Sequence, residues 1–273
     1  FATRQNKEKK NFQNFYIDFM ETTLLEVIKK NIRLQLDAGA EVVMMFDNSS
    51  LITAPISKEA LKLAGIKYPG HTEMLQALTD THLGKLVHDV PVRMMLANPE
   101  LRTVLVSIHV SLRQAIEAVT VDNVLQTLRI AHNSLRNAQG GSPRLALAGL
   151  NPHAGEGGLM GREEIDILEP ALELARSLGI DASGPYPPDT VFMRARASHG
   201  QANAIDAVVA MYHDQGLIPV KYMGLAHGVN VTLGLPFVRT SPDHGTAFDI
   251  AGLGAADPLS MIAAIKLACE LAG

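Results

Sequence analysis

Apolar residues recur along the chain with two different spacings, one typical of buried strands and the other of amphipathic helices. Short apolar runs predict buried strands at residues 42–46, 104–108, 145–150 and 207–212. Longer stretches, with apolar side chains three or four positions apart, predict helices at residues 25–36, 121–135, 161–178 and 257–271. Because strands and helices alternate, we expect an α/β fold with a parallel-rich sheet and flanking helices. The proline-rich residues 183–188 predict a stiff loop.

Size and composition narrow the class of protein. The chain has 273 residues, of which 47% are apolar and 19% charged, enough for one large or two modest domains. A formal net charge of -4 argues against a nucleic-acid partner, which usually requires a basic face. No apolar run is long enough to cross a bilayer, so no membrane partner is expected. The single cysteine, Cys269, excludes an internal disulfide and fits a reducing, cytoplasmic location.

Three histidines each follow a predicted strand. His109 and His213 come directly after apolar runs, and His153 lies in the loop after another. Ligands of open α/β sheets bind beyond the carboxyl ends of the strands, so these imidazoles could converge on one divalent metal. Three protein ligands would leave positions open for water or substrate. Each histidine could equally be a surface or packing residue, and the residues alone leave both alternatives open.

The loop that contains His153 is rich in glycine. Glycines in the segment 151–158 would let the backbone approach a ligand, and the start of the following helix would attract an anion. A turn also needs glycine for its own geometry, so this signal is weak. Glu163 and Glu164 follow at the predicted helix start, where we expect their charges to interact favourably with the helix dipole.

Several charged and polar residues are candidates for substrate binding or proton transfer. Lys221, Asn230 and Arg239 lie in one stretch, and lysine and arginine pair well with phosphate or carboxylate. Asp189 and Asp214 lie near the proposed metal edge, where either could orient a hydroxyl or accept a proton. The structural alternatives are solvated surface charges for the cations, and a helix cap or a turn for the aspartates.

Six strings of residues resemble, in order, motifs of the 4-hydroxythreonine-4-phosphate dehydrogenase family. They are LITAPISKEALKLAGIKYPGHTEM, GLNPHAGEGGLMGREEI, GPYPPDTVF, AMYHDQGLIPVKY, GVNVTLGLPFVRTSPDHGTAFDIAG and ADP. The resemblance runs from about Ser49 to the C-terminus. It implies an isocitrate/isopropylmalate dehydrogenase-like fold and a homodimer with the active site at the subunit interface.

The same resemblance implies a role for particular residues. The metal, which would be zinc, cobalt or magnesium, would be held by His109, His153 and His213. The residues that would contact substrate are His71, Thr72, Lys221, Asn230 and Arg239. The residues that would take part in catalysis are Lys221, Asp189 and Asp214. A loop similar to the cofactor loop of isopropylmalate dehydrogenases would hold the adenosine end of NAD or NADP through His244, Gly245, Thr246, Ala247, Asp249 and Gly252.

The implied reaction is oxidation of the secondary alcohol of 4-phosphohydroxy-L-threonine. The metal would polarise the hydroxyl oxygen while hydride passes to the nicotinamide, and the 3-oxo acid would then lose carbon dioxide on the way to pyridoxal phosphate (vitamin B6). Leu159 stands where these enzymes often carry histidine. It resembles instead a branch that acts on 4-phosphothreonate or 4-phosphoerythronate, and related enzymes oxidise aromatic dihydrodiols. These substrates therefore remain alternatives.

The N-terminal residues depart from the family pattern. The family opens with a strand and a Gly/Pro-rich turn, whereas residues about 15–50 resemble a helix–strand unit of uroporphyrinogen decarboxylase, a metal-free (β/α)8 barrel. We therefore expect a foreign segment at residues 1–48 and a dehydrogenase region at residues 49–273, so that the N-terminal part of the family fold is missing or replaced. The alternative to an active enzyme is an inactive truncated chimera.

Overall fold

The computed structural model describes residues 44–46, 50–63, 65–68, 70–84, 91–139, 141–224, 226–251 and 253–272. The chain divides into two compact units, one formed by residues up to Val92 together with Leu235–Ala272, and the other by Arg93–Gly234. The helix predicted at residues 25–36 and the predicted boundary between residues 48 and 49 lie outside the described residues. None of the described helices combines the length and apolar character that a membrane crossing requires.

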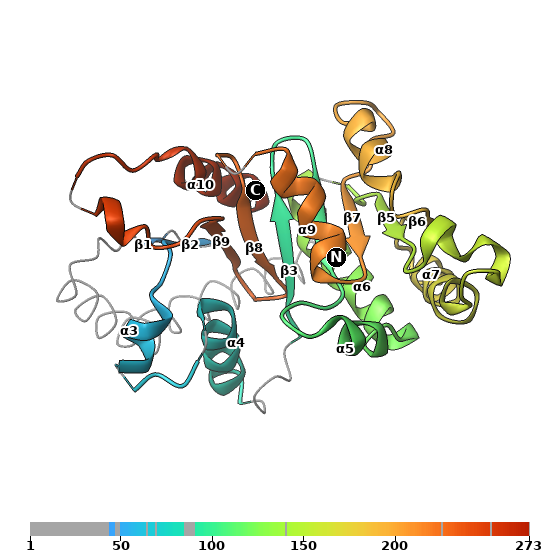
Figure 1. The fold of residues 1–273 in the computed structure, drawn as a ribbon, viewed down its shortest axis with the longest axis horizontal. Helices are drawn as coiled ribbons and strands as arrows, with labels where there is room; N and C mark the ends of the chain where they lie inside the picture. The colour runs from blue at the N-terminus through green and yellow to red at the C-terminus, as the bar shows by residue number, and fades with distance from the viewer. Residues whose placement is uncertain are drawn as a thin grey trace, which may run out of the picture. The chain divides into compact units, whose positions relative to one another are not determined.

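The first unit combines three strands of the described chain with the C-terminal helix. Its strands are β1 (Met44–Phe46), β2 (Ser50–Thr53) and β9 (Val238–Pro242). Strand β2 pairs antiparallel with β1 and parallel with β9. Helix α10 (Leu259–Ala272) contacts both β2 and β9, and the Thr240 hydroxyl donates a hydrogen bond to the Ala264 carbonyl. The unit also contains α3 (Lys58–Leu63), α4 (His71–His82) and the short helix η4 (Phe248–Ile250) (Figure 1).

The second unit contains the strands that place the candidate histidines. Their order is β8-β3-β4-β7-β5-β6. The bounds are β3 (Arg93–Ala97), β4 (Arg102–Leu105), β5 (Leu145–Ala148), β6 (Ala182–Tyr186), β7 (Ala207–Ala210) and β8 (Val229–Leu233). The four strands β4, β7, β5 and β6 are parallel, whereas β3 runs antiparallel to β4 and β8. The predicted α/β fold with a parallel-rich sheet is therefore confirmed.

Helices pack along the strands of this unit. The long helix α6 (Val121–Gln139) contacts β3, β4, β5, β7 and β8, while α8 (Val191–Ser198) and α9 (His213–Tyr222) contact the central parallel strands (Figure 1). Side chains alternate between the two faces of a strand, so Val208 and Ala210 of β7 share one buried cluster with Leu217 of α9. The remaining helices are α5 (Leu112–Glu117), η2 (Pro152–Gly158), η3 (Glu164–Leu168) and α7 (Glu169–Ser177).

Helix α9 lies unusually close to the sheet because of Gly216. A Cβ atom there would stand 2.5 Å from the Leu105 Cδ2 atom and 2.6 Å from the Thr103 Cγ2 atom. Only glycine therefore allows the first turn of α9 to rest against β4. That turn begins with His213, which is held at the end of β7 as a result.

Two sequence predictions are corrected by the structure. Residues 183–188 are not wholly a loop, because Ala182–Tyr186 pairs with β5 as strand β6. Proline is tolerated there since β6 stands last in the order of the described strands, so one side of it pairs with no other strand of the described chain. The predicted helix at residues 161–178 is not regular either, because it opens with the π-helical turn η3 before α7 begins.

Candidate functional site

The three candidate metal ligands follow three neighbouring parallel strands. Strand β7 stands between β4 and β5, so the carboxyl ends of all three lie at one edge of the sheet. His109 follows β4, His213 follows β7 and His153 follows β5. The strands end two or three residues earlier than predicted. They are nevertheless parallel neighbours, as a common site for the three histidines needs. This edge is where ligands bind in open α/β sheets.

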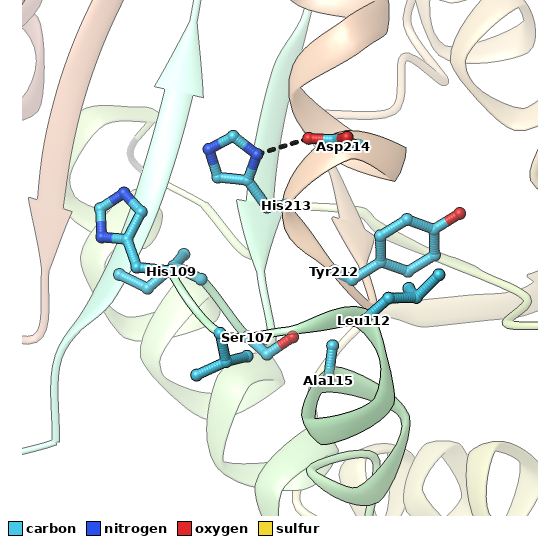
Figure 2. A pocket seen from close by; sticks show the side chains of 9 residues that line it. Ser107, His109, Leu112, Ala115, Tyr212, His213 and Asp214 are labelled. Atoms are coloured by element: carbon cyan, nitrogen blue, oxygen red, sulfur yellow. Dashed lines mark hydrogen bonds and ion pairs between the residues drawn. The ribbon is translucent and has the colours of Figure 1, made fainter.

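His109 and His213 lie side by side at this edge. Their ring centroids are 5.8 Å apart, with 44° between the ring planes (Figure 2). Two imidazoles that share one zinc ion, with Zn–N bonds of about 2.0–2.1 Å, have centroids on the order of 5–6 Å apart. The spacing of the two rings therefore fits a shared divalent ion.

Asp214 orients the His213 ring. The Nδ1 atom of His213 lies 2.7 Å from the Asp214 Oδ1 atom, and because a carboxylate can only accept, Nδ1 is the donor. This tautomer leaves the Nε2 lone pair available as a ligand, an arrangement common around protein-bound metals. In Figure 2 the Nε2 edge of His213 is turned away from Asp214.

A pocket opens beside the two rings. Its volume is about 280 Å³. It is lined by Ser107, Ile108, His109, Val110, Leu112, Ala115, Tyr212, His213 and Asp214. The lining joins two imidazoles and a carboxylate to an apolar wall, which suits a small organic substrate with a polar reacting group.

His153 occupies an unusual backbone conformation. From His153 to Gly157 five consecutive residues have positive φ, with values of 52° at His153, 52° at Ala154 and 44° at Glu156. Such left-handed residues cost about 1–2 kcal/mol each when they are not glycine. Backbone strain of this kind is often found at functional sites, which is consistent with a metal-coordinating role for His153.

The histidines are not assembled into a complete ligand set. Among the residues that the structure describes, no group of three or more His, Cys, Asp or Glu side chains is placed to hold a metal ion. The structure brings His109 and His213 together, while His153 is exposed on the turn after the adjacent strand. The donor chemistry and the pair spacing fit a metal, and the third ligand stays a prediction.

Glu164 holds the turn that carries His153, a role that the sequence did not suggest. Its side chain is 1% exposed, and one carboxylate oxygen accepts the backbone N–H groups of Leu150 and Asn151, each at 2.8 Å. The other oxygen accepts the side-chain amide of Asn151 at 2.9 Å. The predicted interaction with the helix dipole therefore does not describe the main role of Glu164. The π-helical turn directs its side chain inward, beneath the loop.

Gln215 is a second residue that sequence reasoning missed. Its amide oxygen accepts the Met211 backbone N–H at 2.7 Å, and its amide nitrogen donates to the Gly149 carbonyl at 2.7 Å. Its position two residues after His213, in the first turn of α9, was a signal in the sequence. The partner Gly149, just after β5, was not, since it is 66 residues away.

The first unit contains a candidate anion site around Arg239. The Arg239 side chain is 6% exposed and donates a hydrogen bond of 2.7 Å to the Thr53 hydroxyl. Burial lowers the pKa of Arg239 to about 10, while Glu73 opposes this shift. His71 is also buried, and desolvation, followed by the charge of Arg239, lowers its pKa to about 3. His71 and Thr72 open helix α4, whose first backbone N–H groups favour an anion.

The remaining predicted substrate and catalytic residues lie in the second unit. Lys221 is exposed near the end of α9, and Asn230 pairs with Leu96 across β8 and β3. Asp189 is exposed in the turn after β6. The predicted substrate residues are thus divided between the units, with His71, Thr72 and Arg239 in the first.

The predicted cofactor loop belongs to the first unit. His244 Nδ1 lies 2.8 Å from the Gly245 carbonyl oxygen, and Ala247 has a φ of 48° just before η4, which includes Asp249. Gly245 has open space around its Cα, and Thr246 is half-buried. Gly252 lies outside the described residues. The loop exposes backbone and small side chains, as expected for a nucleotide-binding segment.

Comparison with known proteins places the chain in a family. Residues 20–268 match the family described as pyridoxal phosphate biosynthetic protein PdxA. A 4-hydroxythreonine-4-phosphate dehydrogenase from Beijerinckia indica is 58% identical over 81% of this chain and 62% of its own length. A D-threonate 4-phosphate dehydrogenase from Salmonella typhimurium is 49% identical over 86% of this chain and 68% of its own length. The crystal structure of a 4-hydroxythreonine-4-phosphate dehydrogenase from Klebsiella pneumoniae, 43% identical, aligns with a TM-score of 0.71 over 88% of this chain and 67% of its own.

These matches also bear on the extent of the chain. It spans 62% of the length of the Beijerinckia indica relative. The family match begins at residue 20, within the segment predicted to be foreign. The matches lend no support to a resemblance of residues 15–50 to uroporphyrinogen decarboxylase, and the origin of that segment stays a prediction. Because the match covers most of the chain, the protein belongs to the PdxA family of pyridoxal phosphate biosynthetic proteins.

Proposed function

We propose that this chain is a metal-dependent, NAD(P)-linked dehydrogenase that oxidises the secondary alcohol of 4-phosphohydroxy-L-threonine. The observation that supports it most is the pairing of His109 and His213 at the ends of adjacent parallel strands, beside a pocket. The anion site around Arg239 supports a phosphorylated substrate. Relatives named as 4-hydroxythreonine-4-phosphate dehydrogenases support the reaction class.

The chain's own residues supply binding and orientation. His109, His213 and His153 would hold a zinc, cobalt or magnesium ion, which when bound supplies electrophilic stabilisation of a developing alkoxide. Asp214 accepts a hydrogen bond from Nδ1 of His213, which orients the ring so that Nε2 of the neutral imidazole can serve as the ligand. A hydroxyl proton would leave through Lys221 or Asp189, both exposed to solvent.

The substrate's phosphate would bind in the first unit. Arg239 offers a buried cation, and a charge-assisted hydrogen bond is stronger away from water. His71 is neutral at pH 7 because its pKa is lowered to about 3, so it can donate one hydrogen bond without adding charge. The loop at His244–Ala247 and Asp249, with Gly252, would hold NAD or NADP as the hydride acceptor. The product, a 3-oxo acid, would then lose carbon dioxide.

Other properties belong to the same proposal. A homodimer with a shared active site, a small phosphorylated substrate and a cytoplasmic location follow from the family resemblance and from the single Cys269. An inactive chimera is the alternative if residues 1–48 are foreign, as the sequence predicts.

Leu159 favours a second substrate. Its side chain is 80% exposed, next to the turn that carries His153. A relative named as a D-threonate 4-phosphate dehydrogenase fits 4-phospho-D-threonate or 4-phosphoerythronate as the alternative. An aromatic dihydrodiol is the further alternative, since a solved terephthalate dihydrodiol dehydrogenase from Burkholderia xenovorans is 33% identical to this chain.

Substrate choice can be measured directly. We expect NADH to form when the purified chain, with zinc and NAD, is given 4-phosphohydroxy-L-threonine, and more slowly with 4-phospho-D-threonate. The variant Arg239→Met should raise KM by about 10- to 100-fold for either substrate, because a charge-assisted bond worth roughly 1.5–3 kcal/mol is lost. The variant Arg102→Met, at a half-buried position on β4, is the control. Faster turnover of 4-phospho-D-threonate would contradict the proposed substrate and assign the chain to the branch of the family that acts on phosphorylated sugar acids.

A further inference from the structure

Gln215 joins the strand ends that precede His213 and His153. Its bonds reach Met211, the first residue after β7, and Gly149, the first residue after β5. Both of these residues are buried, so their backbone groups depend on partners within the protein. One side-chain amide therefore fixes the separation of two neighbouring loops at the point where they leave the sheet.

The third strand end is tied into the same set of bonds. The Ser107 hydroxyl, which follows β4, donates to the Met211 carbonyl at 2.9 Å. Ser107 lines the pocket together with His109 and His213 (Figure 2). Met211 is thus bonded to Ser107 on one side and to Gln215 on the other, and the ends of β4, β7 and β5 are connected in their spatial order.

Glutamine is the residue type that this position requires. Its amide accepts from an N–H group and donates to a carbonyl at once, and only one orientation of the amide satisfies both. Glutamate would place a carboxylate oxygen against the Gly149 carbonyl, and an apolar side chain would leave both backbone groups without this partner. The first turn of α9 holds the side chain in reach, since Gly216 lets the helix lie against β4.

We propose that Gln215 is a positioning residue that holds the strand ends leading to His213 and His153 in the arrangement that binding of a divalent cation requires. This role rests on the proposed function, because the cation is part of it. Gln215 orders the chain that carries His213 and the chain that leads to His153, so its loss allows these ends to separate. Residues that orient metal ligands typically change metal affinity by about 10- to 100-fold when replaced.

Cobalt binding tests this role without relying on activity. The metal-free chain is titrated with Co²⁺, and affinity and the visible absorption bands are recorded for the wild type and for Gln215→Met. We expect affinity to fall by about 10- to 100-fold, with a changed band pattern. The matched control is Gln201→Met. The side-chain amide of Gln201 also donates a hydrogen bond to a backbone carbonyl, that of Ala197 in α8, but it lies away from the strand ends.

The outcomes separate this role from the proposed function. A Gln215→Met chain with wild-type cobalt affinity and spectrum overturns the role, even if its melting temperature is lower, because the residue would then only brace the fold. If the wild type and His213→Ala bind cobalt equally weakly, the metal site itself is wrong and both proposals fail. Should Gln215→Met not fold, Gln215→Glu keeps the length of the side chain and an acceptor for the Met211 N–H, but loses the donor to the Gly149 carbonyl. Unchanged cobalt affinity and spectrum in that variant overturn the role, and a weakened site supports it.

Discussion

His71 shows how burial sets the chemistry of a single side chain. Desolvation and the nearby charge of Arg239 both disfavour its protonated form, which is why its pKa lies near 3. The same burial that would strengthen a hydrogen bond from Arg239 to an anion keeps His71 neutral. The proposed phosphate would then meet the Arg239 cation and the neutral His71 at the start of α4, with no second buried charge to desolvate.

This burial predicts a pH dependence of stability. The unfolded chain takes up a proton at His71 near pH 6.5, whereas the folded chain does so only near pH 3. The free energy of unfolding should therefore fall as pH drops from about 6.5 toward 3, with a slope approaching about 1.4 kcal/mol per pH unit. Urea unfolding at pH 7 and pH 5 measures this, and His71→Gln should remove on the order of 2 kcal/mol of the fall. Equal losses in wild type and variant would show that His71 is protonated in the folded state.

At the level of elements, the turn after β5 and the helix that follows it act together. The left-handed residues from His153 to Gly157 are costly on their own, and Glu164 offsets that cost by bonding the backbone at Leu150 and Asn151. The π-helical turn provides this contact, since one extra residue in the turn changes which side chains face the loop. A regular helix start would leave the turn without this support.

Removing the Glu164 carboxylate should loosen the turn. In Glu164→Ala the N–H groups of Leu150 and Asn151 lose their acceptor, which should cost about 1–3 kcal/mol of unfolding free energy in chemical denaturation. Glu173→Ala is the control, because Glu173 is exposed on α7, and it should stay within about 0.5 kcal/mol of the wild type. A Glu164→Ala chain as stable as the control would mean that water replaces the carboxylate without cost.

For the whole molecule, the sequence predicted the fold class and the three strand ends because both depend on local patterns. Apolar runs and the residue after each run are visible without tertiary contacts, so His109, His153 and His213 could be placed at one edge. The inward turn of Glu164, the bond from Gln215 to Gly149 and the pairing of β6 could not, because each depends on a partner distant in sequence. The convergence of His153 with the other two stays a prediction for the same reason.

Metal-dependent formation of NADH tests the central claim most directly. The chain is stripped with a chelator and given NAD and 4-phosphohydroxy-L-threonine, and absorbance is followed before and after zinc or cobalt is added. We expect no turnover without metal, turnover on its addition, and a loss of at least about 100-fold in kcat/KM for His109→Ala and His213→Ala. Turnover that is unchanged by the chelator, or that survives both substitutions, would contradict a metal-dependent dehydrogenase built on these strand ends.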